Sequence, residues 1–67
     1  MGKYSVTIQY DASDNIYIAS VPELRGCKAH GDTPEEALRE IKIAFELWIE
    51  TAREHGITIP EPIMYAG

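Results

Sequence analysis

Residues 33–56 form the stretch TPEEALREIKIAFELWIETAREHG, which carries signals for a helix at both of its ends. Thr33 and Glu36 match the capping box S/T-x-x-E, in which each side chain accepts a hydrogen bond from the other residue's backbone N–H. Pro34 suits the first helical position because its missing N–H donor would be unpaired there anyway. At the other end, Gly56 can adopt the left-handed backbone conformation that ends many helices. The sequence therefore predicts one long helix between these two signals.

Upstream of the helix, the chain predicts three short strands joined by tight connections. Residues 3–10 alternate between apolar and polar side chains, which is the period of a strand with one buried face. Residues 11–15 are turn formers, so they predict a hairpin loop that leads into a second strand at 16–21. A connection that begins with Pro22 separates this strand from a third at 27–31. Short connections favour an antiparallel meander over parallel crossovers.

The expected fold is α+β with two layers, in which the helix, predicted at 34–55, covers the apolar side of the three-stranded meander. The helix presents one broad apolar stripe to the sheet, made of Leu38, Ile41, Phe45, Trp48, Ile49 and Ala52. Burial of each large side chain contributes roughly 1.5–3 kcal/mol, so this stripe should supply much of the core energy. Residues 57–59 predict a short fourth strand, which gives the order βββαβ in a single domain over residues 1–67.

Ile43 and Leu47 fall outside the apolar stripe, because at about 100° per residue they point well away from Ile41. They are four residues apart, so one lies a turn above the other. The acidic residues on the same side of the helix are Glu36, Glu40, Glu50 and Glu54. Two branched apolar residues inside an acidic rim predict a contact surface for a partner or a second subunit. The alternative is that they are ordinary isolated apolar residues on a protein surface.

Size and charge limit the class of function. A chain of 67 residues holds one domain with a small core, and its single cysteine excludes an internal disulfide, so we expect a homo-oligomer or a tight partner. The net charge of −5 argues against direct binding of nucleic acid and would attract a basic protein. No apolar run approaches the ~20 residues of a membrane span, and the amino terminus is not a signal sequence. We therefore expect no membrane association and, by default, a cytoplasmic location.

The reactive side chains form no recognisable catalytic or metal-binding set. Cys27 and His30 are three apart on a predicted strand, so their side chains point to opposite faces, and Cys27 is expected to be a buried apolar residue. His30 has no neighbour placed to orient it as a general base. Asp11 and Asp14 lie in a predicted turn, whereas metal-dependent hydrolysis needs several carboxylates around one cavity. We expect no enzyme, no cofactor and no metal.

Three groups of residues follow one another along nearly the whole chain. They are IASVPEL at 18–24 with Gly26-Cys27, GDTPEEAL at 31–38, and FELWIE at 45–50 with IPEP at 59–62. In this order and spacing they resemble the amino-terminal domain of the HicB antitoxin family. The helix-start segment is weak by itself, because it is mostly capping chemistry, but it becomes specific beside VPEL-x-GC. Arg25 stands where relatives often carry Pro, which bears only on the conformation of this loop.

The resemblance implies a βββαβ domain, described as a reduced ribonuclease H-like fold without the catalytic carboxylates. It also implies a partner, because family members bind HicA, a small basic ribonuclease toxin, and block its action. Many relatives carry a carboxy-terminal DNA-binding domain that this sequence lacks, so we expect a stand-alone relative that neutralises a HicA-like toxin. One alternative is a homo-oligomeric structural or regulatory protein with no toxin partner. Another is a vestigial metal-dependent nuclease.

Overall fold

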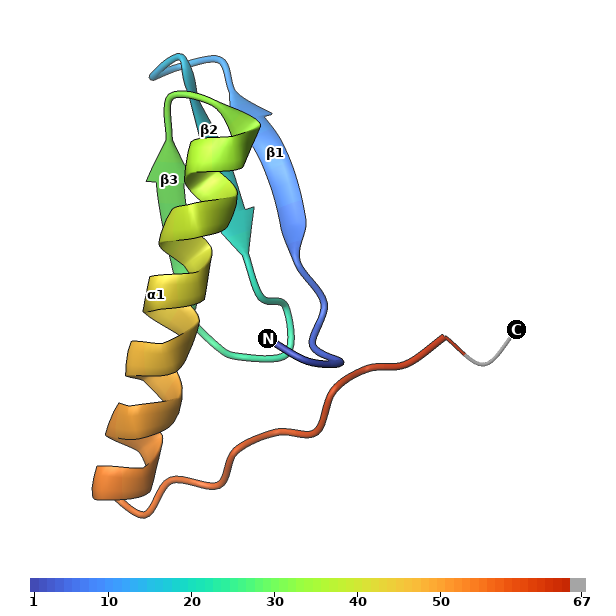
Figure 1. The fold of residues 1–67 in the computed structure, drawn as a ribbon, viewed down its shortest axis with the longest axis vertical. Coiled ribbons are helices and arrows are strands. Elements are labelled where there is room, and N and C mark those ends of the chain that lie inside the picture. The colour runs from blue at the N-terminus through green and yellow to red at the C-terminus, as the bar shows by residue number, and fades with distance from the viewer. Residues whose placement is uncertain (66–67) are drawn as a thin grey trace.

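The computed structural model describes residues 1–65, so the last two residues of the predicted domain lie outside it. Three strands precede one helix (Figure 1): β1 (Thr7–Asp11), β2 (Ile16–Ser20), β3 (Lys28–Gly31) and α1 (Pro34–Glu54). The strands lie in the order β1-β2-β3, and both neighbouring pairs are antiparallel. The predicted meander and the α+β class are therefore confirmed. The central strand is β2, and β1 and β3 are the two edges.

The first strand, predicted at 3–10, begins only at Thr7. The cause is a competing hydrogen bond just before it, because the Ser5 N–H donates to the Glu23 carboxylate at 3.0 Å. A backbone donor that is engaged with a side chain is lost to the strand ladder. The second and third strands agree with their predicted ranges to within one residue.

The prediction of a fourth strand at 57–59 is wrong, because these residues form no strand in the structure. After the helix the chain runs away from the foot of α1 and past the N-terminal segment, not alongside an edge of the sheet (Figure 1). It is held there by the Tyr4 hydroxyl, which donates to the Pro60 carbonyl oxygen at 2.6 Å. Pro60 and Pro62 also lack the N–H that a strand ladder requires.

The amino-terminal end of α1 is capped as predicted, with one difference. The Thr33 hydroxyl accepts a hydrogen bond from the Glu36 N–H at 3.1 Å, which is the first half of the capping box. The Glu36 carboxylate accepts from the Asp32 N–H at 3.2 Å, one residue before the predicted donor. The cap therefore also orders the short link between β3 and α1.

The carboxyl-terminal end of α1 is closed by Gly56, which has a left-handed φ of +65°. The N–H of Gly56 donates to the Arg53 carbonyl at 3.4 Å, and the N–H of Ile57 donates to the Ala52 carbonyl at 2.8 Å. This is the Schellman pattern, in which the last carbonyls of a helix find donors in the residues that follow. The helix itself ends at Glu54, one residue earlier than predicted.

The start of α1 lies directly against the end of β3. A Cβ atom built on Gly31 would lie 2.5 Å from the backbone nitrogen of Ala37 and 2.8 Å from the carbonyl carbon of Glu36. Real Cβ atoms do not approach backbone atoms so closely. Glycine at this position therefore allows the helix to pack on β3 at short distance.

The core lies between α1 and the sheet, and its buried members are Ala19, Val21, Leu24, Cys27, Ala37 and Ile41. Leu24, in the connection between β2 and β3, is 1% exposed and anchors this connection to the core. The helix packs mainly against β3 and β2 and little against β1. Ala37 and Ile41 consequently occupy the centre, whereas Leu38, predicted for the stripe, is 37% exposed at its flank.

Candidate protein-binding surface

Ile43 and Leu47 project from α1 on the side away from the core, and their side chains are 61% and 62% exposed. The prediction that they lie outside the buried stripe is therefore confirmed. Ile41, only two residues from Ile43, is fully buried, which fits the rotation of about 200° that two residues make around a helix. Whether Ile43 and Leu47 contact another chain remains a prediction.

The two apolar residues border a shallow hollow of about 720 Å³ between α1 and β3. The charged and polar residues around it are Lys28 and His30 from β3 and Glu36, Arg39 and Glu40 from α1. Two of the four glutamates expected around Ile43 and Leu47 therefore border this hollow, together with basic side chains that were not expected. The sequence pattern of the helix alone did not reveal them, because Lys28 and His30 come from a strand whose position beside α1 is set by tertiary packing.

A second hollow, of about 510 Å³ and mostly apolar, continues along the same side of α1. It shares Lys28, Ala44 and Leu47 with the first hollow and extends to Cys27 and Trp48. Together the two hollows form one groove between α1 and the outer edge of β3, which we call the β3 groove. The part of the groove beside Cys27 and Trp48 is mostly apolar, the part beside Glu36 and Glu40 is mixed, and Leu47 borders both.

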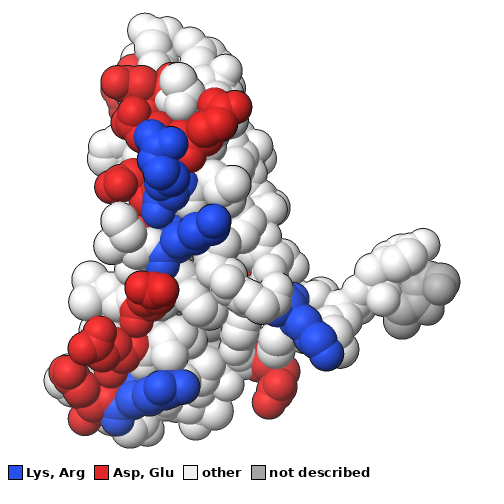
Figure 2. All heavy atoms as spheres, in the orientation of Figure 1, with Lys and Arg blue, Asp and Glu red and all other residues white. Residues whose placement is uncertain are grey.

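Glu50 and Glu54 do not line the β3 groove. They border a separate hollow of about 460 Å³ near the foot of α1, together with Phe45, Ile49 and Arg53. Figure 2 shows acidic side chains gathered over the start and the second half of α1, with basic side chains between them. The six residues predicted as one contact surface therefore fall into two groups.

The loop before β3 is fixed by an interaction that the sequence did not predict. Trp48 was expected to be a core residue, and it is partly buried against the core. Its indole N–H also donates to the Arg25 carbonyl oxygen at 2.9 Å. This hydrogen bond fixes the loop at Arg25, which forms the side of the β3 groove opposite α1.

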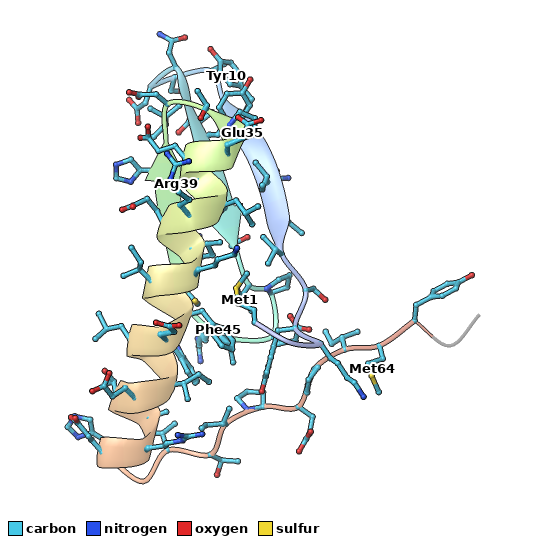
Figure 3. The ribbon with its side chains drawn as sticks, in the orientation of Figure 1. Met1, Tyr10, Glu35, Arg39, Phe45 and Met64 are labelled. Atoms are coloured by element: carbon cyan, nitrogen blue, oxygen red, sulfur yellow. The ribbon has the colours of Figure 1, made fainter. Side chains whose placement is uncertain are left out.

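Glu23 joins three segments of the chain, and no signal in the sequence pointed to this role. Its carboxylate accepts hydrogen bonds from the Ser5 N–H, the Ser5 hydroxyl and the Ile63 N–H at 3.0, 3.0 and 2.9 Å. Desolvation acts to raise the pKa of this carboxyl, but the hydrogen bonds from Ile63 and Ser5 outweigh it and hold the pKa below its ordinary value. The N-terminal and C-terminal segments are thereby tied to the loop after β2 (Figure 3).

The reactive side chains lie as the sequence predicted. Cys27 is 3% exposed, and burial raises the pKa of its thiol, which disfavours the reactive thiolate. His30 is exposed on β3. Asp11 accepts a hydrogen bond from the Ser13 N–H at 2.9 Å, the chemistry of a turn.

Two kinds of feature are absent from the part of the chain that the structure describes. Within residues 1–65, no three His, Cys, Asp or Glu side chains are grouped so that they could hold a metal ion. In the same range, no helix has the length and apolar character needed to cross a membrane.

The structure defines a small α+β domain in which one helix covers a three-stranded antiparallel meander. Residues 4–66 match the family described as HicB-like antitoxin of bacterial toxin-antitoxin systems. The chain belongs to this family.

Similar proteins carry the name UPF0150. One from Synechocystis sp. is 40% identical over 57 residues, which cover 85% of this chain and 77% of the relative. Another from Thermoplasma acidophilum is 43% identical over 58 residues, which cover 87% of this chain and 83% of the relative. No solved structure shows a significant match to the chain.

Proposed function

We propose that this chain binds a small basic ribonuclease toxin of the HicA kind and neutralises it by contact, without catalysis of its own. The observation that carries the proposal is the family match over residues 4–66. The net charge of −5 supports it, because an acidic protein attracts a basic one and speeds their encounter. The proposal includes a cytoplasmic location, where a ribonuclease toxin would meet its RNA.

The exposed carboxylates near the foot of α1 are the proposed point of attraction for the toxin. Glu46, Glu50 and Glu54 are all exposed and lie within about two turns of one another. Phe45 and Ile49 border the same hollow and are only partly buried, so they offer apolar surface beside the charges. Charged rims mainly set the encounter rate and the choice of partner, while apolar contacts supply most of the affinity.

Co-expression with a small basic reading frame that neighbours the gene tests this function. We expect a stable complex and loss of the toxin's ribonuclease activity in it. Replacement of Glu50 and Glu54 by Lys should slow association by at least about tenfold at low salt, and added salt should reduce the difference. Glu61→Lys, an exposed carboxylate outside α1, is the matched control. A basic neighbour that stays active and unbound with the wild-type chain would refute the proposal.

A homo-oligomer with another role is the second candidate, and the exposure of Ile43 and Leu47 favours it. A metal-dependent nuclease is the weakest hypothesis. We expect purified protein to leave RNA intact in Mg²⁺ or Mn²⁺, and metal-dependent cleavage that survives repurification would revive it.

A further inference from the structure

The outer edge of β3 carries backbone groups that are free to pair with a further strand. Within the described residues, β3 is hydrogen-bonded to β2 alone. The Val21 N–H donates to the Cys27 carbonyl oxygen at 3.1 Å, so this carbonyl faces β2. Because backbone groups alternate in direction along an antiparallel strand, those of Ala29 also face β2, and those of Lys28 and His30 face outward. Such an edge is a template for strand addition.

A strand added at this edge would meet apolar surface on the side of the sheet that α1 covers. Ala29 lies opposite Ala19, which is fully buried, so the Ala29 side chain faces the helix. Every second residue of the added strand would face the same way. These residues would lie beside Ala44 and Leu47, which border both hollows of the β3 groove. Apolar side chains are therefore favoured at these positions.

On the other side of the sheet, the added strand would meet basic side chains. Lys28 and His30 are exposed, and they point away from α1 because side chains alternate along a strand. Neither β2 nor β3 contains an acidic residue, and the acidic residue of the sheet, Asp11, lies on β1. Opposite charges on neighbouring strands attract. Acidic side chains are therefore favoured at the alternate positions of the added strand.

The same charges argue against a second β3 as the added strand. Antiparallel pairing of β3 with β3 of another copy would bring two basic faces together, and like charges opposite one another are destabilising. The free edge of β1 offers apolar surface at Ile8 and Tyr10, but β1 carries no basic residue. An acidic strand is thus attracted to β3 and not to β1. The net charge of −5 opposes this attraction little, because salt screens charges farther away than about 8 Å.

We propose that β3 accepts a strand from a partner protein in which apolar and acidic side chains alternate. The apolar side chains pack beside Leu47 and Trp48, and the acidic side chains lie beside Lys28 and His30. Backbone hydrogen bonds to the β3 edge supply affinity, and the side chains on the two faces supply specificity. The site is separate from the hollow near the foot of α1, so this inference does not require a toxin.

A short capped peptide in which glutamate and leucine alternate tests the site on the purified chain alone. Trp48 is the single tryptophan and borders the groove, so its fluorescence should change to saturation as the peptide is added. The outward amides of Lys28 and His30 should exchange more slowly in the complex, and the amide of Ala29 is the internal control. No saturable change, or binding that protects β1 in place of β3, would overturn the proposal.

Charge reversal at the edge tests the specificity. Lys28→Glu should weaken binding of the glutamate–leucine peptide by roughly tenfold, because an attractive cross-strand pair becomes a repulsive one. The variant should instead prefer a peptide in which lysine replaces glutamate. Lys42→Glu is the matched control, since Lys42 is exposed on α1 and lines neither hollow of the groove, and it should bind as the wild type does. Equal weakening by both variants would contradict a specific site at β3.

Decanoate separates strand addition from the binding of a small ligand. It is an apolar chain with one negative charge, but it has no backbone that could pair with β3. We expect no saturable change in Trp48 fluorescence at concentrations at which the peptide saturates. Decanoate that binds as tightly as the peptide and displaces it would show that the groove takes a small amphipathic anion, and the proposal would be wrong.

Discussion

Ile41 and Ile43 are the same residue type, two positions apart on α1, and they lie in opposite environments. Ile41 is fully buried in the core, whereas Ile43 is 61% exposed above the β3 groove. The two sides of the helix therefore have different roles. One side holds the fold together, and the other is free to contact another chain, so a substitution on each side should affect a different measurement.

The largest expected effect is on the buried side. Ile41→Ala should lower the free energy of unfolding by about 2–5 kcal/mol, because it leaves a cavity between α1 and the sheet. In a domain with so small a core, this loss can abolish the cooperative transition. Ile43→Ala is the matched control and should change the free energy of unfolding by no more than about 0.5 kcal/mol, because Ile43 is 61% exposed. Urea denaturation of the two variants and the wild type measures both, and equal losses would contradict the division of the helix.

The close packing of the buried side of α1 on β3 can be tested at Gly31. Gly31→Ala should destabilise the fold by roughly 1–3 kcal/mol, because the added Cβ would collide with the backbone of α1. Gly56→Ala is the comparison, since nothing lies within 4 Å of its added Cβ and only the left-handed backbone is strained, at roughly 1 kcal/mol. Thermal unfolding ranks the two variants. A Gly31→Ala protein as stable as the wild type would show that α1 does not pack so tightly on β3.

A smaller effect on stability is expected at Glu23, which holds the segment that follows α1. The Glu23 pKa lies below its ordinary value in the folded chain. Between this lowered pKa and the ordinary pKa of glutamate, the unfolded chain therefore binds more protons than the folded chain. The stabilisation is therefore complete above the ordinary pKa of a glutamate and is lost as the pH falls through the lowered folded value. Glu23→Gln should flatten this part of the stability curve.

Denaturation of both proteins at a series of acidic pH values measures the difference. The Ile63 amide, which donates to Glu23, should also exchange with solvent faster in the variant. Glu61→Gln serves as a control, because Glu61 is exposed. Parallel stability curves for the wild type and Glu23→Gln would contradict the role of this carboxylate.

The features that could be predicted from the sequence are those that depend on local chemistry. The two helix ends follow from Thr33, Pro34 and Gly56, whose preferences are set within one turn of the chain. The hairpin before β2 follows from its run of turn formers. The outward position of Ile43 and Leu47 follows from helical periodicity alone.

The features that the sequence missed depend on contacts between distant segments. The strand at 57–59 has a suitable composition, but the Tyr4–Pro60 hydrogen bond and two prolines direct the segment away from the sheet. Lys28 borders the same hollow as Ile43 and Leu47 only because β3 packs beside α1. Periodicity along one element carries no information about charges that another element brings to it.

The most direct test of the division between the two sides of α1 is amide hydrogen exchange in the variants Ile41→Ala and Ile43→Ala. The amides of β2 and β3 should exchange faster in Ile41→Ala, because the lost packing lowers the free energy of opening. In Ile43→Ala they should exchange as in the wild type, because the Ile43 side chain is 61% exposed. Equal acceleration in both variants, or acceleration in Ile43→Ala alone, would contradict the account.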